Sequence, residues 1–164
     1  MYTLFAYVRH LLTSTNQHGV HSPFVYNYIT KCLYTRSKYK ASKSQKAALK
    51  SISYFKMQRI KLVPTDAQME KMIQKELHLK VSDAHPFDFI YANYPSFDLL
   101  TNHKEQIHND SMFLINNIHN SKSNAANWKV LKQHKAVTVS IDMFHCGALF
   151  FREEQVKEHF KIRI

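Results

Sequence analysis

The segment from Val137 to Phe151 constrains the fold more than any other part of the chain. Residues 137–141 read Val-Thr-Val-Ser-Ile, in which apolar and polar side chains alternate with the period of a β-strand. Residues 147–151 read Gly-Ala-Leu-Phe-Phe, an apolar run that is too short for a helix and typical of a strand buried on both faces. The link between them suits a tight turn, which predicts an antiparallel hairpin inside a sheet. The rest of the chain must supply further strands and covering helices.

Three upstream segments are candidate strands, and helical patterns separate them. They are Arg59–Val63, Phe87–Ala92 and Met112–Ile115. Strands that alternate with helices are typical of an α/β fold with a largely parallel sheet. We therefore expect a sheet of about five strands with helices on both faces. The length fits a single domain, residues 1–164, in which 1–58 form a basic helical N-terminal region and 59–164 form the α/β core.

The first expected helix, Tyr2–Leu12, is apolar. One face of it carries Leu4, Phe5, Val8, Leu11 and Leu12. Two interpretations of this face stay open. Either the helix docks on the domain, or this face meets a partner or a membrane surface.

Charge is distributed unevenly along the chain. The net charge is +11, and all twelve acidic residues lie at or beyond Asp66. A cluster of cations within the acid-free part is interleaved with Tyr34 and Tyr39, which favours weak binding of nucleic acid or of an anionic surface. If six of these cations met phosphates, the log–log salt slope on duplex DNA would be roughly −5, but no established nucleic-acid motif is present. The cluster comprises Arg36, Lys38, Lys40, Lys43, Lys46 and Lys50.

The two cysteines, Cys32 and Cys146, fit no metal-binding spacing, and two lone thiols favour a reducing, cytoplasmic location. No apolar run is long enough to span a bilayer, so we expect no transmembrane segment, and residues 1–12 lack the features of a signal peptide. His18 and His21 flank a glycine, and Asp142 stands near His145 and Cys146. Both sets are weak candidates for metal ligands, and we expect no metal site.

Three segments resemble class I S-adenosylmethionine-dependent methyltransferase-like proteins of Bacteroidetes-type bacteria. They are residues 18–26 (His-Gly-Val-His-Ser-Pro-Phe-Val-Tyr), 116–121 (Asn-Asn-Ile-His-Asn-Ser) followed by Trp128, and 140–152 (Ser-Ile-Asp-Met-Phe-His-Cys-Gly-Ala-Leu-Phe-Phe-Arg). The resemblance covers both ends of the chain better than the middle. It implies a seven-stranded Rossmann-like sheet, here reduced, whose last strand is antiparallel. It also places Gly147–Phe151 between Met112–Ile115 and Val137–Ile141.

The cofactor-binding half departs from the family. After the first strand, where the resemblance implies a Gly-rich loop, this chain reads Val63-Pro-Thr-Asp, and Thr65 with Gln68 reads as a helix-capping pair. A glycine-free loop leaves little room for the cofactor to approach the backbone. Too few residues precede Phe87 for the family's second and third strands, so the carboxylate for the ribose hydroxyls has no counterpart. Val63, Thr65 and Asp66 would be vestiges of the cofactor site.

Amides stand where the family tends to have acids. Asn93 follows the Phe87–Ala92 strand, and Asn116 and Asn117 follow Met112–Ile115. An amide carries no charge and cannot act as a carboxylate base. His119 remains as a general-base candidate, although it could equally tie a loop by a hydrogen bond. These four residues are vestigial catalytic candidates.

The departures favour a methyltransferase-like pseudoenzyme that binds no cofactor and acts as a binding or scaffold protein. Two alternatives stay open: an active S-adenosyl-L-methionine-dependent methyltransferase whose site is atypical or completed by a partner, and a basic protein that binds nucleic acid or an anionic surface. Loss of the outer strands would also leave Arg59–Val63 as an exposed sheet edge. We expect the basic front, a second copy of the chain or another protein to cover that edge.

Overall fold

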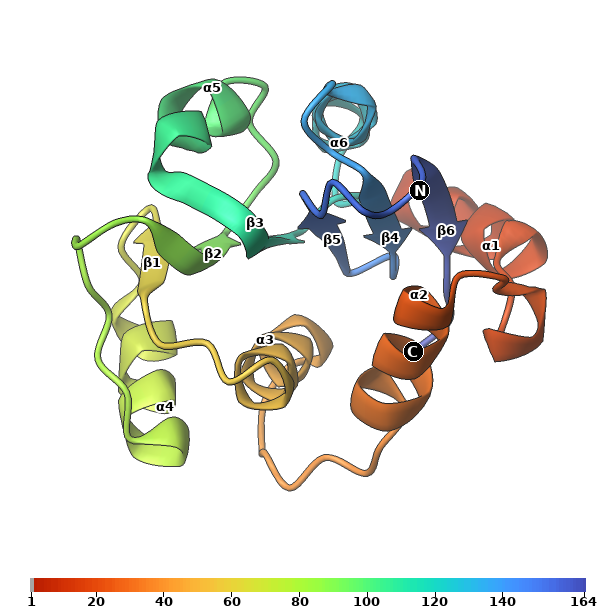
Figure 1. The fold of residues 1–164 in the computed structure, drawn as a ribbon. Coiled ribbons are helices and arrows are strands. Elements are labelled where there is room, and N and C mark those ends of the chain that lie inside the picture. The colour runs from red at the N-terminus through yellow and green to blue at the C-terminus, as the bar shows by residue number, and fades with distance from the viewer. Residues whose placement is uncertain (1) are drawn as a thin grey trace.

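The computed structural model describes residues 2–164 and contains one mixed six-stranded sheet (Figure 1). The strand order is β1-β2-β3-β5-β4-β6. The strands are β1 (Ile60–Val63), β2 (Phe87–Ala92), β3 (Ile107–Asn116), β4 (Val139–Asp142), β5 (Cys146–Phe150) and β6 (Glu158–Lys161). The reduced Rossmann-like α/β fold expected from the sequence is confirmed.

The hairpin lies inside the sheet, as the sequence predicts. β5 pairs antiparallel with β3, where Ile115 faces Gly147, and antiparallel with β4, where Val139 faces Phe150. Every residue of β4 and β5 is buried. This insertion of the last hairpin strand between two earlier strands is the arrangement that the resemblance implies.

The sixth strand is not predicted by the sequence pattern. β6 pairs parallel with β4, where Ile141 faces Phe160, so the last strand along the chain is parallel to its neighbour and the antiparallel hairpin strand precedes it. Its sequence, Glu-His-Phe-Lys, is short, polar and only partly buried. A segment of this kind has no clear strand pattern in its sequence. It forms a strand because the free edge of β4 offers it hydrogen-bond partners. Thr15 forms a further parallel bridge with Ile162, beyond β6.

The other edge of the sheet differs from the expectation as well. Ile60 of β1 forms a single parallel bridge with Val81, and the Ser82 N–H donates to the Ile60 carbonyl at 2.9 Å. Lys61 also pairs with the carboxylate of Asp83. The prediction that the basic front covers this edge is wrong, because part of the chain between β1 and β2 lies there. Cover by a second copy or another protein stays a prediction.

Helices cover both faces of the sheet (Figure 1). One face carries α2, α3 and α4, and the other carries α5 and α6. Strand side chains alternate between two apolar clusters: Phe89 and Leu114 belong to the cluster with α2, α3 and α4, whereas Ile90 and Phe113 belong to the cluster with α5 and α6. The helices are α1 (Tyr2–Thr13), α2 (Pro23–Tyr28), α3 (Lys43–Tyr54), α4 (Ala67–Leu77), α5 (Leu99–His103) and α6 (Lys122–Gln133). Two short 3₁₀ helices, η1 (Gln17–Gly19) and η3 (Lys104–Gln106), and a π-helical segment, η2 (Ile29–Leu33), complete the set.

Helix α1 lies beside β6 with its apolar face outward (Figure 1). Leu4, Phe5, Val8, Leu11 and Leu12 are all exposed. The helix docks on the domain, as one interpretation held, but not through this apolar face. Contact of the face with a partner or a membrane surface stays a prediction. The opposite side of α1 docks and buries His10. Within residues 2–164, no helix combines the length and the apolar character needed to cross a bilayer.

Candidate functional site

A cavity of about 520 Å³ opens at the carboxyl end of β3. Four segments contribute to it: the start of α1, the start of α3, the loop after β3 and the turn between β4 and β5. Ligands of α/β proteins bind outside the carboxyl ends of the strands, and the volume is in the range of small-molecule sites. The lining residues are Thr3, Ser42, Lys43, Ser44, Asn116, Asn117, His119, Asn120, Phe144 and His145.

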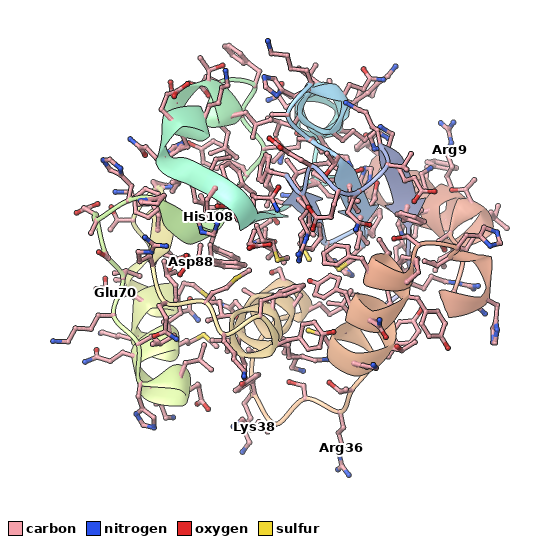
Figure 2. The ribbon with its side chains drawn as sticks, in the orientation of Figure 1. Arg9, Arg36, Lys38, Glu70, Asp88 and His108 are labelled. Atoms are coloured by element: carbon pink, nitrogen blue, oxygen red, sulfur yellow. The ribbon has the colours of Figure 1, made fainter. Side chains whose placement is uncertain are left out.

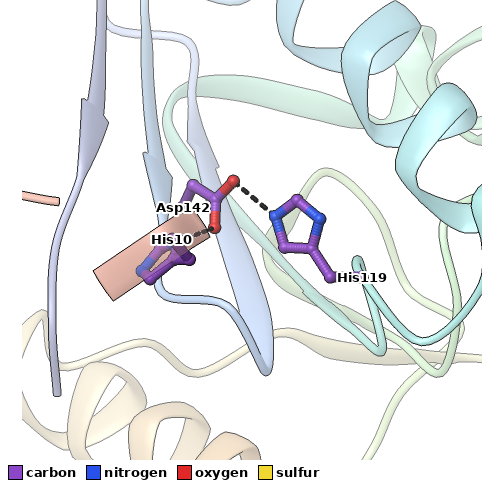
Figure 3. Close-up of side chains that lie close together, drawn as sticks. All are labelled: His10, His119 and Asp142. Atoms are coloured by element: carbon purple, nitrogen blue, oxygen red, sulfur yellow. Dashed lines mark hydrogen bonds and ion pairs between the residues drawn. The ribbon is translucent and has the colours of Figure 1, made fainter. Parts of the chain in front are cut away.

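Asp142 lies beside this cavity as the last residue of β4 and joins two histidines from distant segments (Figure 3). His119 Nε2 lies 2.7 Å from Asp142 Oδ2, and His10 Nδ1 lies 3.3 Å from Asp142 Oδ1. The Phe144 N–H donates to Oδ1 at 3.0 Å. The Phe144 ring also stacks on the His119 ring at 5.3 Å between centroids, so the turn of the hairpin helps to orient His119.

The electrostatics of the cluster follow from burial. Burial raises the pKa of Asp142, but the hydrogen bond and the charge of His119, the Phe144 N–H and His10 together outweigh it and lower the pKa below its ordinary value. Burial lowers the pKa of His10, and the opposing pull of Asp142 and of the Ile162 carbonyl does not restore it. Asp142 is therefore a carboxylate and His10 is a neutral imidazole at neutral pH.

His10 has no hydrogen bond of normal geometry. Its side chain is only 4% exposed, and neither ring nitrogen has a hydrogen-bond partner. The Asp142 oxygen at 3.3 Å raises the pKa of the ring by its charge, and a contact with the Ile162 backbone raises it as a hydrogen bond does, but neither contact has the geometry of a regular hydrogen bond. Most buried polar side-chain atoms are hydrogen-bonded, and among the described residues the His10 ring shares this exception with Trp128 Nε1.

The amides predicted as vestigial catalytic residues tie loops together. Asn117 Nδ2 donates to the Asn93 carbonyl at 3.0 Å, and Asn124 Nδ2 donates to the Asn117 carbonyl at 2.8 Å. The Asn116 side chain accepts from the Asn117 N–H at 2.9 Å. Asn116, Asn117 and His119 line the cavity, whereas Asn93 contributes only its carbonyl to this network.

The predicted vestiges of the cofactor site lie elsewhere. The Asp66 carboxylate accepts from the Met69 N–H at 2.9 Å and so forms the N-cap of α4, which corrects the predicted cap by Thr65 and Gln68. Thr65 is exposed, and Val63 ends β1. The residues that line the cavity do not include Val63, Thr65 or Asp66.

The basic cluster is split between the surface and internal contacts. Lys50 Nζ donates to the carbonyls of Leu33 and Thr35, and Lys43 Nζ donates to the Ile164 carbonyl at 2.8 Å. Arg36 and Lys38 point away from the body of the molecule (Figure 2). Of the two tyrosines interleaved with the cations, Tyr39 is buried and not available to stack on bases, and only Tyr34 is exposed. The six cations comprise Arg36, Lys38, Lys40, Lys43, Lys46 and Lys50.

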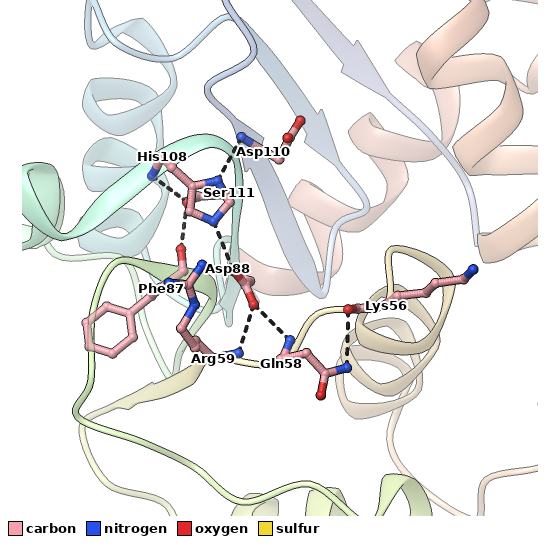
Figure 4. Close-up of polar contacts among 8 residues, drawn as sticks. All are labelled: Lys56, Gln58, Arg59, Phe87, Asp88, His108, Asp110 and Ser111. Carbon is pink, nitrogen blue, oxygen red and sulfur yellow. Dashed lines mark hydrogen bonds and ion pairs between the residues drawn. The ribbon is translucent and has the colours of Figure 1, made fainter.

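A second polar cluster surrounds Asp88 at the amino ends of the strands (Figure 4). Asp88 accepts from the backbone N–H groups of Gln58 and Arg59, from the Arg59 guanidinium and from His108 Nε2. This edge is opposite to the one where α/β enzymes place their chemistry. The cluster fixes the entry to β1 and the start of β3, which is a structural role.

His10 was not among the residues predicted from the sequence, and Asp142 was predicted beside His145 and Cys146 instead. In the structure, His145 is exposed, and burial raises the pKa of the Cys146 thiol to about 12, so this thiol is not a ready metal ligand. The available signal was a histidine on the otherwise apolar first helix together with an acid at a strand end. No pattern in the residues around His10 or around Asp142 indicated that the two side chains meet.

Comparison of the chain with protein-family models, curated proteins and solved structures finds no match.

Proposed function

We propose that this protein is a degenerate class I S-adenosylmethionine-dependent methyltransferase-like protein, a pseudoenzyme that has lost its cofactor site and acts as a binding or scaffold protein. The observation that carries the proposal is the edge of the sheet at β1. Beyond β1 lies the single Ile60–Val81 bridge, in place of the two strands that the resemblance implies. The placement of β5 between β3 and β4 supports the methyltransferase-like part of the proposal.

The methionine end of the cofactor would meet an unsuitable turn. Close approach of a ligand to the backbone needs residues without side chains and with free N–H groups. After β1 the chain places Pro64, which has no N–H, and Asp66, whose carboxylate already caps α4. A negative charge at this position also disfavours the cofactor's own carboxylate.

The ribose end would lack its partner. The first acidic residue after Val81 in the sequence is Asp83, and its carboxylate pairs with Lys61. A charge-assisted hydrogen bond contributes roughly 1.5–3 kcal/mol, so the loss of two or three removes roughly 3–9 kcal/mol. A dissociation constant of one micromolar corresponds to a binding free energy of only about 8.2 kcal/mol. Little or no affinity for the cofactor would remain.

The cavity beside β3 is the part of the fold that suits a binding role. Its lining offers amide, hydroxyl, imidazole and ammonium groups and no carboxylate. The nearest acid, Asp142, is buried and engaged with His119. Such a lining favours a small polar ligand that is neutral or anionic.

A thermal-shift titration with S-adenosylmethionine and S-adenosylhomocysteine tests the loss of the cofactor site. A ligand present at one hundred times its Kd adds roughly 2.7 kcal/mol to the stability of the folded state. We expect no shift with either compound. Saturable calorimetric binding at micromolar affinity would overturn the proposal, and so would methyl transfer that is abolished by His119→Ala.

A further inference from the structure

Three ligand atoms of the kind that transition metals prefer converge beside the cavity (Figure 3). They are a ring nitrogen of His10, a ring nitrogen of His119 and a carboxylate oxygen of Asp142, all within 4.8 Å of one another. Among the side chains that the structure describes, this is the group of three that could hold a metal ion. The ligands come from α1, from the loop after β3 and from the end of β4, so the tertiary fold creates the group.

The unsatisfied His10 ring is an independent sign that the group serves a ligand. A buried imidazole normally donates from one nitrogen and accepts at the other. His10 does neither within the described structure, although Nδ1 faces Asp142 Oδ1 at 3.3 Å. If Nδ1 carries a lone pair, two acceptors face each other, and a cation between them would bind both.

We propose that His10, His119 and Asp142 bind a divalent transition-metal ion of the zinc type. Two imidazoles and one carboxylate are a common protein ligand set for zinc and for non-haem iron. The inference does not depend on whether the cofactor site has been lost, because none of these residues belongs to the predicted cofactor segment. It also differs from the two metal-ligand sets considered from the sequence.

The ligand atoms must rearrange to take a metal ion. Tetrahedral bonds of about 2.0–2.1 Å place neighbouring ligand atoms about 3.3 Å apart. His10 Nδ1 lies 3.3 Å from Oδ1 of Asp142, but His119 Nε2 lies 2.7 Å from the other oxygen, Oδ2, and the three ligand atoms are spread within 4.8 Å of one another. The hydrogen bond between His119 and Asp142 must therefore open, and the ligand atoms that are farther apart must close toward about 3.3 Å. The metal then takes the place of the Nε2 proton of His119, and that proton moves to Nδ1 of the same ring.

The groups around the cluster can hold the ligands in place. The Phe144 ring stacks on His119, and the Phe144 N–H donates to Asp142. The Ile162 carbonyl lies near the His10 ring, and a backbone carbonyl is a usual partner for the second nitrogen of a metal-bound histidine. These contacts would orient the ligands before a metal arrives.

The site would keep at least one open position. His119 lines the large cavity and also a second hollow of about 330 Å³, which His10 and Lys161 line as well. One carboxylate leaves a divalent ion with excess positive charge, and Lys161 and Arg9 border the second hollow. The open position therefore suits a water molecule or an anionic group of a ligand, in agreement with the carboxylate-free lining of the large cavity.

Metal titration of the chelator-treated full-length chain tests the proposal. We expect Zn²⁺ to bind with one equivalent by calorimetry, and Co²⁺ to give visible absorption bands of a four- or five-coordinate site. Mg²⁺ and Ca²⁺ should bind far more weakly, because they prefer sets made of oxygen ligands. A folded wild-type chain that binds neither Zn²⁺ nor Co²⁺ would overturn the proposal and leave the group as a structural hydrogen-bonded cluster.

Variants locate the bound ion. Asp142→Asn and His119→Gln keep the size of each side chain, and each should weaken Zn²⁺ binding at least about a hundredfold. His145→Ala is the matched control, because His145 is exposed and lines the same cavity but is not in the group. Circular dichroism without metal checks that each variant folds. Binding that survives both substitutions, or that only His145→Ala weakens, would assign the metal to other histidines and contradict the proposal.

A measurement on the wild-type chain decides the matter if the variants do not fold. X-ray absorption of the zinc complex should show two imidazole ligands with nitrogen and oxygen donors at about 2.0–2.2 Å. A sulfur shell, which would point to Cys32 or Cys146, or a shell of water alone would contradict the assignment.

Discussion

Asp88 shows how a single carboxylate can hold three segments of this protein. It accepts two backbone hydrogen bonds at 2.8 Å from Gln58 and Arg59, and its other oxygen accepts from Arg59 Nη2 at 3.0 Å and from His108 Nε2 at 2.9 Å. Burial alone would raise the pKa of Asp88. The two backbone N–H groups, then His108 and the Arg59 side chain, outweigh burial and lower the pKa to about 2.

This pKa predicts a pH dependence of stability with a definite sign. Because the pKa is lower in the folded state than the ordinary value of 3.8, the carboxylate stabilises the folded state fully above about pH 4. The contribution is lost as the pH falls through about 2. It amounts to about 2 kcal/mol. Asp88→Asn should therefore lower the free energy of unfolding by about this amount at pH 7, and the difference from wild type should vanish near pH 2.

Urea denaturation at several pH values measures the difference. Asp83→Asn is the control, because the Asp83 side chain is 91% exposed and should change stability far less. An Asp88→Asn difference that stays constant from pH 7 to pH 2 would show that the loss is steric rather than electrostatic.

At the scale of elements, the contact between β5 and α6 explains one of the two glycines. A Cβ atom on Gly147 would lie 2.7 Å from Trp128 Cζ2 and from Cζ3. Trp128 is buried and belongs to the apolar cluster on the face of the sheet that α6 covers. The absence of a side chain at Gly147 is what lets the indole lie directly on β5.

Gly147→Ala should destabilise the protein by about 1–3 kcal/mol, because overpacking a well-filled core forces side chains and backbone to shift. Thermal unfolding measures the loss, and the fluorescence of Trp128, the one tryptophan, reports any displacement of the ring.

A double-mutant cycle with Trp128→Phe checks the cause. The smaller ring should relieve the clash, so the penalty of Gly147→Ala should shrink in that background. A penalty that is the same in both backgrounds would place the strain elsewhere than at the Gly147–Trp128 contact.

At the scale of the whole molecule, the charge of the N-terminal part remains its most uneven property. Of the six clustered cations, Lys43 and Lys50 are engaged with backbone carbonyls. The other four are Arg36, Lys38, Lys40 and Lys46. Burial also lowers the pKa of Lys50. Fewer than six of the clustered cations are therefore available to bind phosphates.

We expect weak binding to duplex DNA with a log–log salt slope of roughly −4, instead of the −5 that six phosphate contacts would give. Fluorescence anisotropy over a range of salt concentrations measures the slope. The double variant Arg36→Gln with Lys38→Gln should make it shallower by roughly 2.

Lys129→Gln is the matched control for this experiment, because Lys129 is an exposed cation on α6, which covers the opposite face of the sheet. Its slope should equal that of the wild type. Binding that does not change with salt would contradict the electrostatic account, and no binding at low salt would leave the charge as a solubility feature.

The sequence determined the features of this protein that depend on neighbouring residues. Alternation and short apolar runs located β1, β2, β4 and β5 within two residues, because a strand buried in a sheet needs that pattern along its own length. For β3 they located only the buried part and missed residues 107–111. The start of α2 is local in the same sense: Ser22 caps it and Pro23 is its first residue, and both the cap and the fixed φ of proline act within one turn. The resemblance added the position of β5, which local pattern alone did not supply.

Only the tertiary structure decided the features that depend on distant residues. β6 pairs because β4 leaves an edge open, the apolar face of α1 turns outward because the opposite side docks His10, and Val81 meets the edge that the basic front was expected to cover. The cluster of His10, His119 and Asp142 arises in the same way. Its members are separated by 109 and 23 positions in the sequence, and no periodicity links residues that meet only when three segments pack together.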